Sequence, residues 1–268
     1  MQRLASKQRL PATRAWSSEP GLRALWSSMV QASPEPRPPS GTAVLVHGLW
    51  GNPEDWTWVR RILETAGVTV ETPDLPTHRS PQARVQDDVQ LVRDVIRTST
   101  PPVVCAGWSF GGDIASVAAA GQPSVTRVVF LASVPSEPGT EPTDAGWIES
   151  DPHLSVHEDG TYALDNDWWI EAEAKRLFSG EILEHLLRNP RRRVAMSTAT
   201  DPPTAASWQT IPTTVLLGRH DDLIPDDLRR SAESKVADVR YLDTDHFILF
   251  HQPEVVAQTV LQFLRSRR

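Results

Sequence analysis

The stretch Gly107–Gly112, which reads GWSFGG, decides the fold of this chain. Residues 102–106 before it form a short apolar run that predicts a buried strand. Residues 113–120 after it are rich in alanine and predict a helix that ends at Gly121. The sequence therefore predicts a strand, a tight turn and a helix in succession, with Ser109 at the turn.

A serine at such a turn is typical of a nucleophile elbow, in which strained backbone exposes the hydroxyl. Gly107 and Gly111 fit this geometry, because a Cβ at either position would collide with the neighbouring strand and helix. The N-terminus of the helix adds positive potential where an oxyanion would form. The alternative interpretation is a glycine-rich turn without chemistry, so the hypothesis of a nucleophile depends on finding partners for Ser109.

The rest of the chain alternates short apolar runs with amphipathic stretches. The further predicted strands are residues 43–46, 68–70, 125–132, 213–218 and 239–242. The further predicted helices are residues 53–66, 83–97, 225–235 and 254–265. Alternation of this kind predicts an α/β fold with a doubly wound, mostly parallel sheet.

Residues 136–210 interrupt this alternation. We expect no buried strand in them, and helices over residues 168–187 with a break at Ser179-Gly180. Because the segment leaves the sheet at the carboxyl end of a strand, it should emerge on the face that carries Ser109. We therefore expect a mobile helical cap at residues 136–210, inserted into the α/β core.

Residues 1–40 form an N-terminal extension of the core, which comprises residues 41–135 and 211–268. Residues 21–30 have the spacing of a short amphipathic helix, and residues 33–40 form a proline-rich, extended linker. Two interpretations of the extension stay open: a mostly disordered tail, or a helix docked on the domain or on a second subunit. We expect a monomer or a homodimer.

A serine nucleophile needs a histidine base, and the base needs an acid that orients it. Among the histidines that follow Ser109, His246 lies between a predicted strand and the last predicted helix. His251 is the alternative, but it directly precedes the last helix and fits a surface position. The acid should follow another strand, where Asp221 and Asp222 both qualify by composition.

Several stretches together resemble the α/β-hydrolase superfamily and, within it, the compact branch of esterases and hydroxynitrile lyases. They are VLVHGLWGNPEDW, TPDLPTH, GWSFGGDIA, VVFLASVPSEPG, GRHDDLIP and DTDHFILFHQPE, and the resemblance covers residues 41–268. It implies Asp221 as the acid, from a Gly-x-x-Asp-x-x-Ile-Pro pattern, and His246 as the base. It also implies the backbone N–H groups of Leu49 and Phe110 as the oxyanion hole.

Three features depart from the pattern of that family. The extension at residues 1–40 has no counterpart in the compact members, and Thr77 stands where many members have glycine. Trp108 stands where many esterases have histidine before the nucleophile. The last departure leaves the substrate class open rather than the identity of the catalytic residues.

The resemblance implies a serine hydrolase that cleaves a carboxylic ester through an acyl-enzyme. Trp50 and Trp108 flank the predicted oxyanion region, and Trp168 and Trp169 lie in the predicted cap. A pocket with aromatic walls favours a small hydrophobic or aromatic ester as substrate. Packing within the cap is an equal alternative for Trp168 and Trp169.

Two other classes of function use the same fold. A carbon–carbon bond hydrolase or a hydroxynitrile-lyase-like enzyme would use the same three residues, but such a lyase usually has a lysine near its pocket. The predicted cap offers only Lys175. A degenerate hydrolase that binds a ligand without turnover is the other alternative, because a fold does not fix a function.

Charge and cysteine content exclude several partners and sites. The chain has 34 acidic residues against 27 lysines and arginines, a net charge of −7, which makes nucleic acid and anionic membranes poor candidates as partners. The basic cluster at residues 191–193 fits a solvated loop. The single cysteine, Cys105, lies on a predicted buried strand and fits a small core residue.

No targeting or cofactor motif stands out in the sequence. No apolar run approaches the ~18 residues of a membrane span, and the N-terminus lacks the apolar stretch of a secretory signal. We therefore expect a cytoplasmic protein. We expect no metal and no other cofactor, because the sequence has no His/Cys/Asp cluster at metal-ligand spacing and no G-x-G-x-x-G turn.

Overall fold

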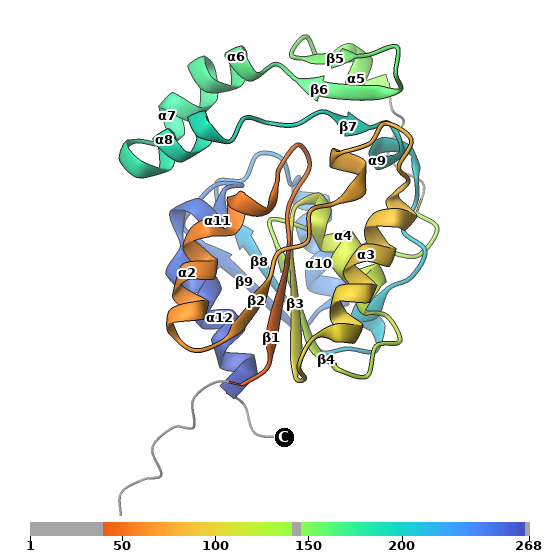
Figure 1. Ribbon diagram of the computed structural model, residues 1–268, viewed down its shortest axis with the longest axis vertical. Coiled ribbons are helices and arrows are strands. Elements are labelled where there is room, and N and C mark those ends of the chain that lie inside the picture. The colour runs from red at the N-terminus through yellow and green to blue at the C-terminus, as the bar shows by residue number, and fades with distance from the viewer. Residues whose placement is uncertain (1–39, 141–145, 266–268) are drawn as a thin grey trace, which may run out of the picture. The chain divides into compact units, whose positions relative to one another are not determined.

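Six parallel strands form the main sheet of the computed structural model, which describes residues 40–140 and 146–265 (Figure 1). Their order is β2-β1-β3-β4-β8-β9, and neighbouring strands run parallel. The strands are β1 Thr42–Val46, β2 Thr69–Glu71, β3 Val103–Trp108, β4 Val125–Leu131, β8 Thr213–Gly218 and β9 Asp238–Leu242. The predicted parallel sheet is confirmed, and the helix predicted at residues 21–30 lies outside the described residues.

Helices cover both faces of this sheet (Figure 1). Helix α2 packs against α12, and α3 packs against α4. Apolar spacing explains this packing, since Val89, Val92 and Ile96 of α3 recur at helical intervals and are buried. The helices are α2 Thr57–Thr65, α3 Val85–Thr98, α4 Phe110–Ala119, α10 Asp226–Lys235, α11 Ile248–His251 and α12 Pro253–Arg265.

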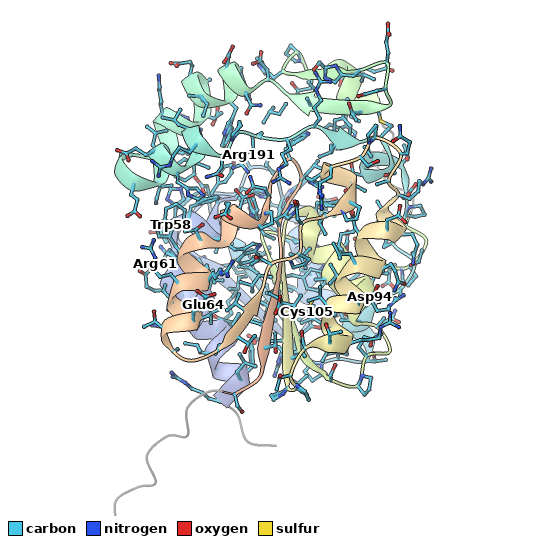
Figure 2. The ribbon with its side chains drawn as sticks, viewed as in Figure 1. Trp58, Arg61, Glu64, Asp94, Cys105 and Arg191 are labelled. Carbon is cyan, nitrogen blue, oxygen red and sulfur yellow. The ribbon has the colours of Figure 1, made fainter. Side chains whose placement is uncertain are left out.

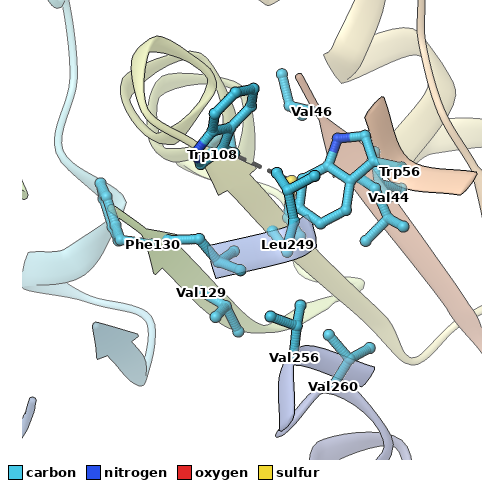
Figure 3. Packing of buried hydrophobic residues seen from close by; sticks show 14 of the residues in the cluster. Val44, Val46, Trp56, Trp108, Val129, Phe130, Leu249, Val256 and Val260 are labelled. Carbon is cyan, nitrogen blue, oxygen red and sulfur yellow. Dashed lines mark hydrogen bonds between the residues drawn. The ribbon is translucent and has the colours of Figure 1, made fainter. Parts of the chain in front are cut away.

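The core between the sheet and the helices is apolar (Figure 3). Cys105 of β3 lies in it with an exposed fraction of 0%, and burial raises the pKa of its thiol to about 12. A thiol that stays protonated in an apolar core is inert, so Cys105 is the small core residue that the sequence predicted. The labelled members of this cluster are Val44, Val46, Trp56, Trp108, Val129, Phe130, Leu249, Val256 and Val260.

Residues 136–210, called here the inserted segment, contain a second sheet that the sequence analysis did not expect. Its strands are antiparallel, in the order β5-β6-β7, with bounds β5 Leu154–Val156, β6 Thr161–Leu164 and β7 Val194–Ala195. The expectation of no buried strand is wrong, because Tyr162 and Val194 are fully buried. Strands of two to four residues are too short to show a period, although Asp159-Gly160 is a recognisable hairpin signal.

The helices of the inserted segment follow the prediction more closely. The predicted break at Ser179-Gly180 separates α7 from α8. A π-helical turn, Trp169–Ala174, joins α6 to α7. The helices are α5 Gly146–Ser150, α6 Asn166–Trp168, α7 Lys175–Leu177, α8 Gly180–Arg188 and α9 Ser197–Thr200. No helix in the described part of the chain is long and apolar enough to cross a membrane.

Candidate active site

Ser109 occupies the turn between β3 and α4. Its backbone has φ 52° and ψ −125°, in the left-handed region that residues with a Cβ rarely adopt. Strain of this kind is on the order of 1–3 kcal/mol and persists only where the surrounding structure holds it. A hydrogen bond of 2.9 Å from Ser109 N to Leu131 O ties the turn to β4. The result is a half-buried serine at the carboxyl edge of the sheet.

The glycines beside Ser109 are needed for close backbone contacts. A Cβ on Gly107 would lie 2.1 Å from the carbonyl oxygen of Gly111. A Cβ on Gly111 would lie 2.4 Å from the carbonyl oxygens of both Val46 and His47. Distances this short are sterically forbidden, so these two positions accept only glycine if α4 is to pack this close to β1 and β3.

Asp221 and His246 meet at the same edge of the sheet. Asp221 follows β8 and His246 follows β9, and the distance from Asp221 Oδ2 to His246 Nδ1 is 2.9 Å. The other carboxylate oxygen accepts a 3.0 Å hydrogen bond from Leu223 N. Asp221 is 2% exposed, whereas Asp222 is exposed to solvent. A buried carboxylate at Nδ1 fixes the tautomer that leaves Nε2 free to accept a proton.

Arg229 holds the loop that carries Asp221, and the sequence analysis missed it. From α10, its guanidinium donates to the carbonyl oxygens of Gly218 at 2.8 Å, Asp221 at 2.5 Å and Ile224 at 2.9 Å. Three carbonyls bound by one planar group fix the course of the loop. The signal in the sequence was weak, because an arginine in the first turns of a helix normally faces solvent.

Trp108 connects the loop of His246 to the strand that precedes Ser109. Its Nε1 donates to the carbonyl oxygen of His246 at 2.9 Å. The indole is 3% exposed and lies against Gly48, where a Cβ would approach its ring to 2.9 Å. Trp108 therefore supports the loop of His246 from the core side of the site.

The two predicted oxyanion donors come from separate segments. Phe110 is the first residue of α4, and the first N–H groups of a helix have no partner within it. Leu49 lies in a turn closed by a 3.1 Å hydrogen bond from Gly51 N to Gly48 O. The carbonyl oxygen of Gly48 also accepts from His47 Nδ1 at 3.0 Å. Because Gly48 O and Leu49 N belong to one peptide plane, these bonds orient the N–H of Leu49.

Thr77, the departure from glycine noted in the sequence, connects two buried groups beside the site. Its hydroxyl donates to Asp88 at 2.6 Å, and its backbone N–H donates to the same carboxylate at 2.9 Å. A 3.0 Å hydrogen bond joins the Thr77 hydroxyl to His78 Nδ1. Burial raises the pKa of Asp88 to about 7 and lowers the pKa of His78 well below its usual value.

Asp88→Asn is expected to stabilise the protein more at pH 8 than at pH 5. Because the pKa of folded Asp88 lies above that of an unfolded aspartate, its contribution to stability is present at low pH and is lost as pH rises toward 7. Urea unfolding at the two pH values should show the variant gaining about 2–3 kcal/mol over wild type across this range. Asp87→Asn, at the exposed neighbour, is the control. A pH-independent difference for Asp88→Asn would contradict the shifted pKa.

The tryptophans predicted to bind substrate lie in different surroundings. Trp169 is 6% exposed, and its ring centroid is 5.3 Å from that of Phe247, the residue after His246. Trp168 stacks on His153 at 3.8 Å, within the inserted segment. Trp50 packs edge to face against Tyr162 at 6.0 Å. Of these three tryptophans, Trp169 is therefore the one that packs beside the loop of His246.

Arg191 is not in a solvated loop, which corrects the expectation from the sequence. It is 7% exposed, and its Nη1 lies 3.3 Å from both carboxylate oxygens of Asp55. Its guanidinium carbon lies 5.2 Å from the ring centroid of Trp169 and 5.9 Å from that of Trp108. Arg192 is half-buried and Arg193 is exposed. The partner of Arg191 is 136 residues away, so the sequence could not reveal that its charge is buried.

The arrangement can perform nucleophilic chemistry. It offers a hydroxyl in strained backbone, an imidazole held by a buried carboxylate, and two backbone segments that present N–H groups. Among residues 40–140 and 146–265, no group of three or more His, Cys, Asp or Glu side chains is placed to hold a metal ion.

Comparisons with known proteins agree with the α/β fold. The family model described as "Alpha/beta hydrolase family" matches residues 43–259. Among curated proteins, no sequence matches this chain.

Many solved structures share the fold at low sequence identity. A pyrethroid hydrolase from Sphingobium faniae has a TM-score of 0.67 and 18% identity, covering 85% of this chain and 98% of its own. An extracellular α/β-hydrolase from a Paenibacillus species has a TM-score of 0.66 and 18% identity, over 83% and 98%. Tomato methylketone synthase I has a TM-score of 0.66 and 17% identity, over 83% and 97%. At such identities the likeness concerns the fold alone.

Proposed function

Because this chain belongs to the α/β-hydrolase family, we propose that it is a serine hydrolase that cleaves carboxylic esters of small hydrophobic or aromatic substrates. The observation that carries the proposal is the 2.9 Å contact between Asp221 and His246 at the edge where Ser109 sits in strained backbone. Strained backbone of this kind is typical of functional sites, which favours catalysis.

The proposed reaction is a two-step acyl transfer. His246 Nε2 takes the proton of the Ser109 hydroxyl while the oxygen attacks the ester carbonyl. The tetrahedral intermediate collapses, and His246 gives the same proton to the departing alcohol. Water then attacks the acyl-enzyme with His246 again as base, which releases the acid and restores Ser109. Asp221 stabilises the imidazolium that forms in each step.

The backbone N–H groups of Leu49 and Phe110 are the proposed donors to the oxyanion. Phe110 opens a ten-residue helix whose N-terminus favours negative charge. Leu49 lies in a turn whose peptide plane is oriented by His47 and Gly51. Burial lowers the pKa of His47, so its ring is neutral, donates through Nδ1 and accepts from Leu75 N through Nε2.

The aromatic groups near the base support a hydrophobic substrate. Phe247 follows His246 directly, and Trp169 and Phe178 pack against its ring at 5.3 and 5.4 Å. Apolar walls with few polar groups are typical of pockets for small hydrophobic ligands. The inserted segment therefore contributes to substrate choice as a cap.

Trp169→Ala is expected to change substrate preference, and Trp168→Ala serves as its control. Trp169 packs beside the loop of His246, so its loss should lower kcat/KM by roughly ten- to a hundredfold, with the largest effect on the best-fitting acyl chain. Trp168 stacks on His153 instead and should change kcat/KM much less. The measurement is kcat/KM over p-nitrophenyl esters from acetate to octanoate, with melting temperatures alongside. If both variants keep the wild-type acyl-chain preference, other residues line the pocket.

The lyase alternative has less support than ester hydrolysis. Lys175, the lysine that the sequence offered for it, is half exposed and forms an ion pair with Glu171 at 2.6 Å. An exposed, paired lysine is a poor proton donor to a substrate in a closed pocket. Assaying the p-nitrophenyl ester panel beside mandelonitrile cleavage tests the proposal, because turnover of the nitrile without turnover of any ester would reverse it.

A further inference from the structure

The turn Gly48–Gly51, called here the 48–51 turn, is held in an unfavourable conformation. Trp50 is its third residue and has a φ of 56°. The third residue of this closed four-residue turn has left-handed backbone, a conformation that glycine adopts freely and tryptophan does not. The hydrogen bond from Gly51 N to Gly48 O lies within the turn itself and would form equally well with glycine at position 50. Something outside the turn must therefore stabilise this conformation.

The inserted segment contacts both the backbone and the side chain of Trp50. The backbone N–H of Arg192 donates to the carbonyl oxygen of Trp50 at 2.8 Å. The ring of Tyr162 packs edge to face against the Trp50 indole at 6.0 Å. Arg192 is fixed in turn by a 2.6 Å ion pair with Asp74 in the loop after β2. The strained residue is thus held at its backbone and at its side chain.

Asp55 closes the other side of the turn and is the partner of Arg191. Its Oδ2 accepts from Asn52 N at 3.1 Å and lies so near Gly51 that a Cβ there would be 2.3 Å away. Asp55 and Arg191 are 1% and 7% exposed. A buried carboxylate without a cation would be strongly unfavourable, so Arg191 fixes where Asp55 can lie.

Arg191 lies where the inserted segment meets the core (Figure 2). Its backbone N–H and carbonyl group are both bonded to the Asn166 side chain, at 2.8 and 2.9 Å. Its guanidinium lies over the rings of Trp108 and Trp169. Among the described residues its Nη2 has no hydrogen-bond partner, so the ion pair to Asp55 and the two indoles hold the group.

We propose that Arg191 is a positioning residue: through Asp55, and together with Arg192, it holds the 48–51 turn in the conformation that directs the N–H of Leu49 at the oxyanion. The inference rests on the proposed ester hydrolysis. Under it, docking of the inserted segment does more than cover the pocket. It completes the oxyanion hole, so the catalytic groups are fully assembled only when the segment is in place.

The first test compares Arg191→Met with Arg193→Ala. Arg193 is the exposed neighbour in the same segment and the matched control. An oxyanion donor contributes about 10²–10³-fold to kcat, so a displaced turn should lower kcat for p-nitrophenyl acetate at least tenfold. KM should change less than threefold, because ground-state binding does not use the donor. Amide hydrogen exchange of residues 47–52 should become at least tenfold faster. Arg193→Ala should stay within twofold of wild type in both measurements.

The second test adds Trp50→Gly to Arg191→Met. Glycine takes the left-handed conformation without strain, so the turn should no longer depend on the inserted segment. The double variant should recover at least half of the lost kcat on a logarithmic scale. Its amide hydrogen exchange at residues 47–52 should be slower than that of Arg191→Met. If Arg191→Met alone fails to fold, Arg191→Met with Asp55→Asn is compared with wild type instead, because it leaves no unpaired buried charge.

The outcomes separate the two hypotheses. Wild-type kcat in Arg191→Met, unchanged exchange at residues 47–52, or a further loss on adding Trp50→Gly would each overturn the positioning role. A different result would overturn only the proposed function: the wild type hydrolyses no ester, yet Arg191→Met still accelerates amide exchange at residues 47–52 and Trp50→Gly slows it again. In that case Arg191 would still stabilise the 48–51 turn.

Discussion

Replacing Ser109 by alanine is expected to lower kcat for p-nitrophenyl ester hydrolysis by at least about 10⁴-fold, since a triad without its nucleophile retains only transition-state binding. The melting temperature should change little. Alanine has the same backbone preferences as serine at φ 52°, and the bond from residue 109 N to Leu131 O does not involve the side chain. Initial rates at high enzyme concentration give kcat, and thermal melts give the melting temperature.

Ser116→Ala is the matched control for this experiment. Ser116 lies on the same helix, α4, but its buried hydroxyl bonds to Ser207 Oγ at 3.0 Å and to Ser207 N at 3.2 Å. Its loss should reduce stability by about 1–3 kcal/mol and leave kcat near wild type. A Ser109→Ala protein that keeps more than a few per cent of wild-type hydrolysis would remove Ser109 as the nucleophile.

Asp221→Asn should lower kcat by about 10⁴-fold, and Asp222→Asn should leave it within about twofold. The amide of asparagine can present an N–H to His246 Nδ1, which favours the tautomer with its proton on Nε2. That tautomer cannot take the proton of Ser109. The hydrogen bond from Leu223 N can still be accepted by the asparagine oxygen, so the loop should keep its shape. Asp222 is exposed, and its charge should be screened by water.

Steady-state kinetics from pH 5 to 9 on both variants decide between the neighbouring acids. Measuring across this range shows whether the loss of kcat in Asp221→Asn depends on pH. Equal effects in the two variants, or a larger effect in Asp222→Asn, would mean that the acid has been assigned to the wrong residue.

The main sheet could be predicted because its information is local. Strand β8 is buried along its whole length, and its apolar centre, Val215–Leu217, is preceded by two β-branched threonines and followed by a glycine. Its predicted and observed bounds are therefore the same, Thr213–Gly218. The turn at Ser109 is equally local, since Gly107 and Gly111 are required by contacts of their own backbone. These features depend on neighbours in sequence or on burial alone.

The contacts of the inserted segment could not be predicted because they depend on partners far along the chain. The local sequence of Arg191 is that of a solvated arginine, and only the fold brings Asp55 and Trp169 around it. Arg229 was missed for a different reason: its acceptors are close in sequence but are backbone carbonyls, which every sequence has. Nothing in residue type or spacing distinguishes a buried arginine of this kind from an exposed one.

The position of His246, shortly after an edge strand, has a consequence for local stability. Within the described sheet β9 lies at the end, beside β8, and each of its residues is only partly buried. Sub-global opening of such an edge requires less free energy than unfolding of the central strands. The loop of His246 follows β9, so if His246 is the base, we expect the reactive fraction of molecules to follow the free energy of this local opening more closely than that of global unfolding. Moderate heat or denaturant should thus abolish the proposed hydrolysis in a molecule whose central strands remain paired.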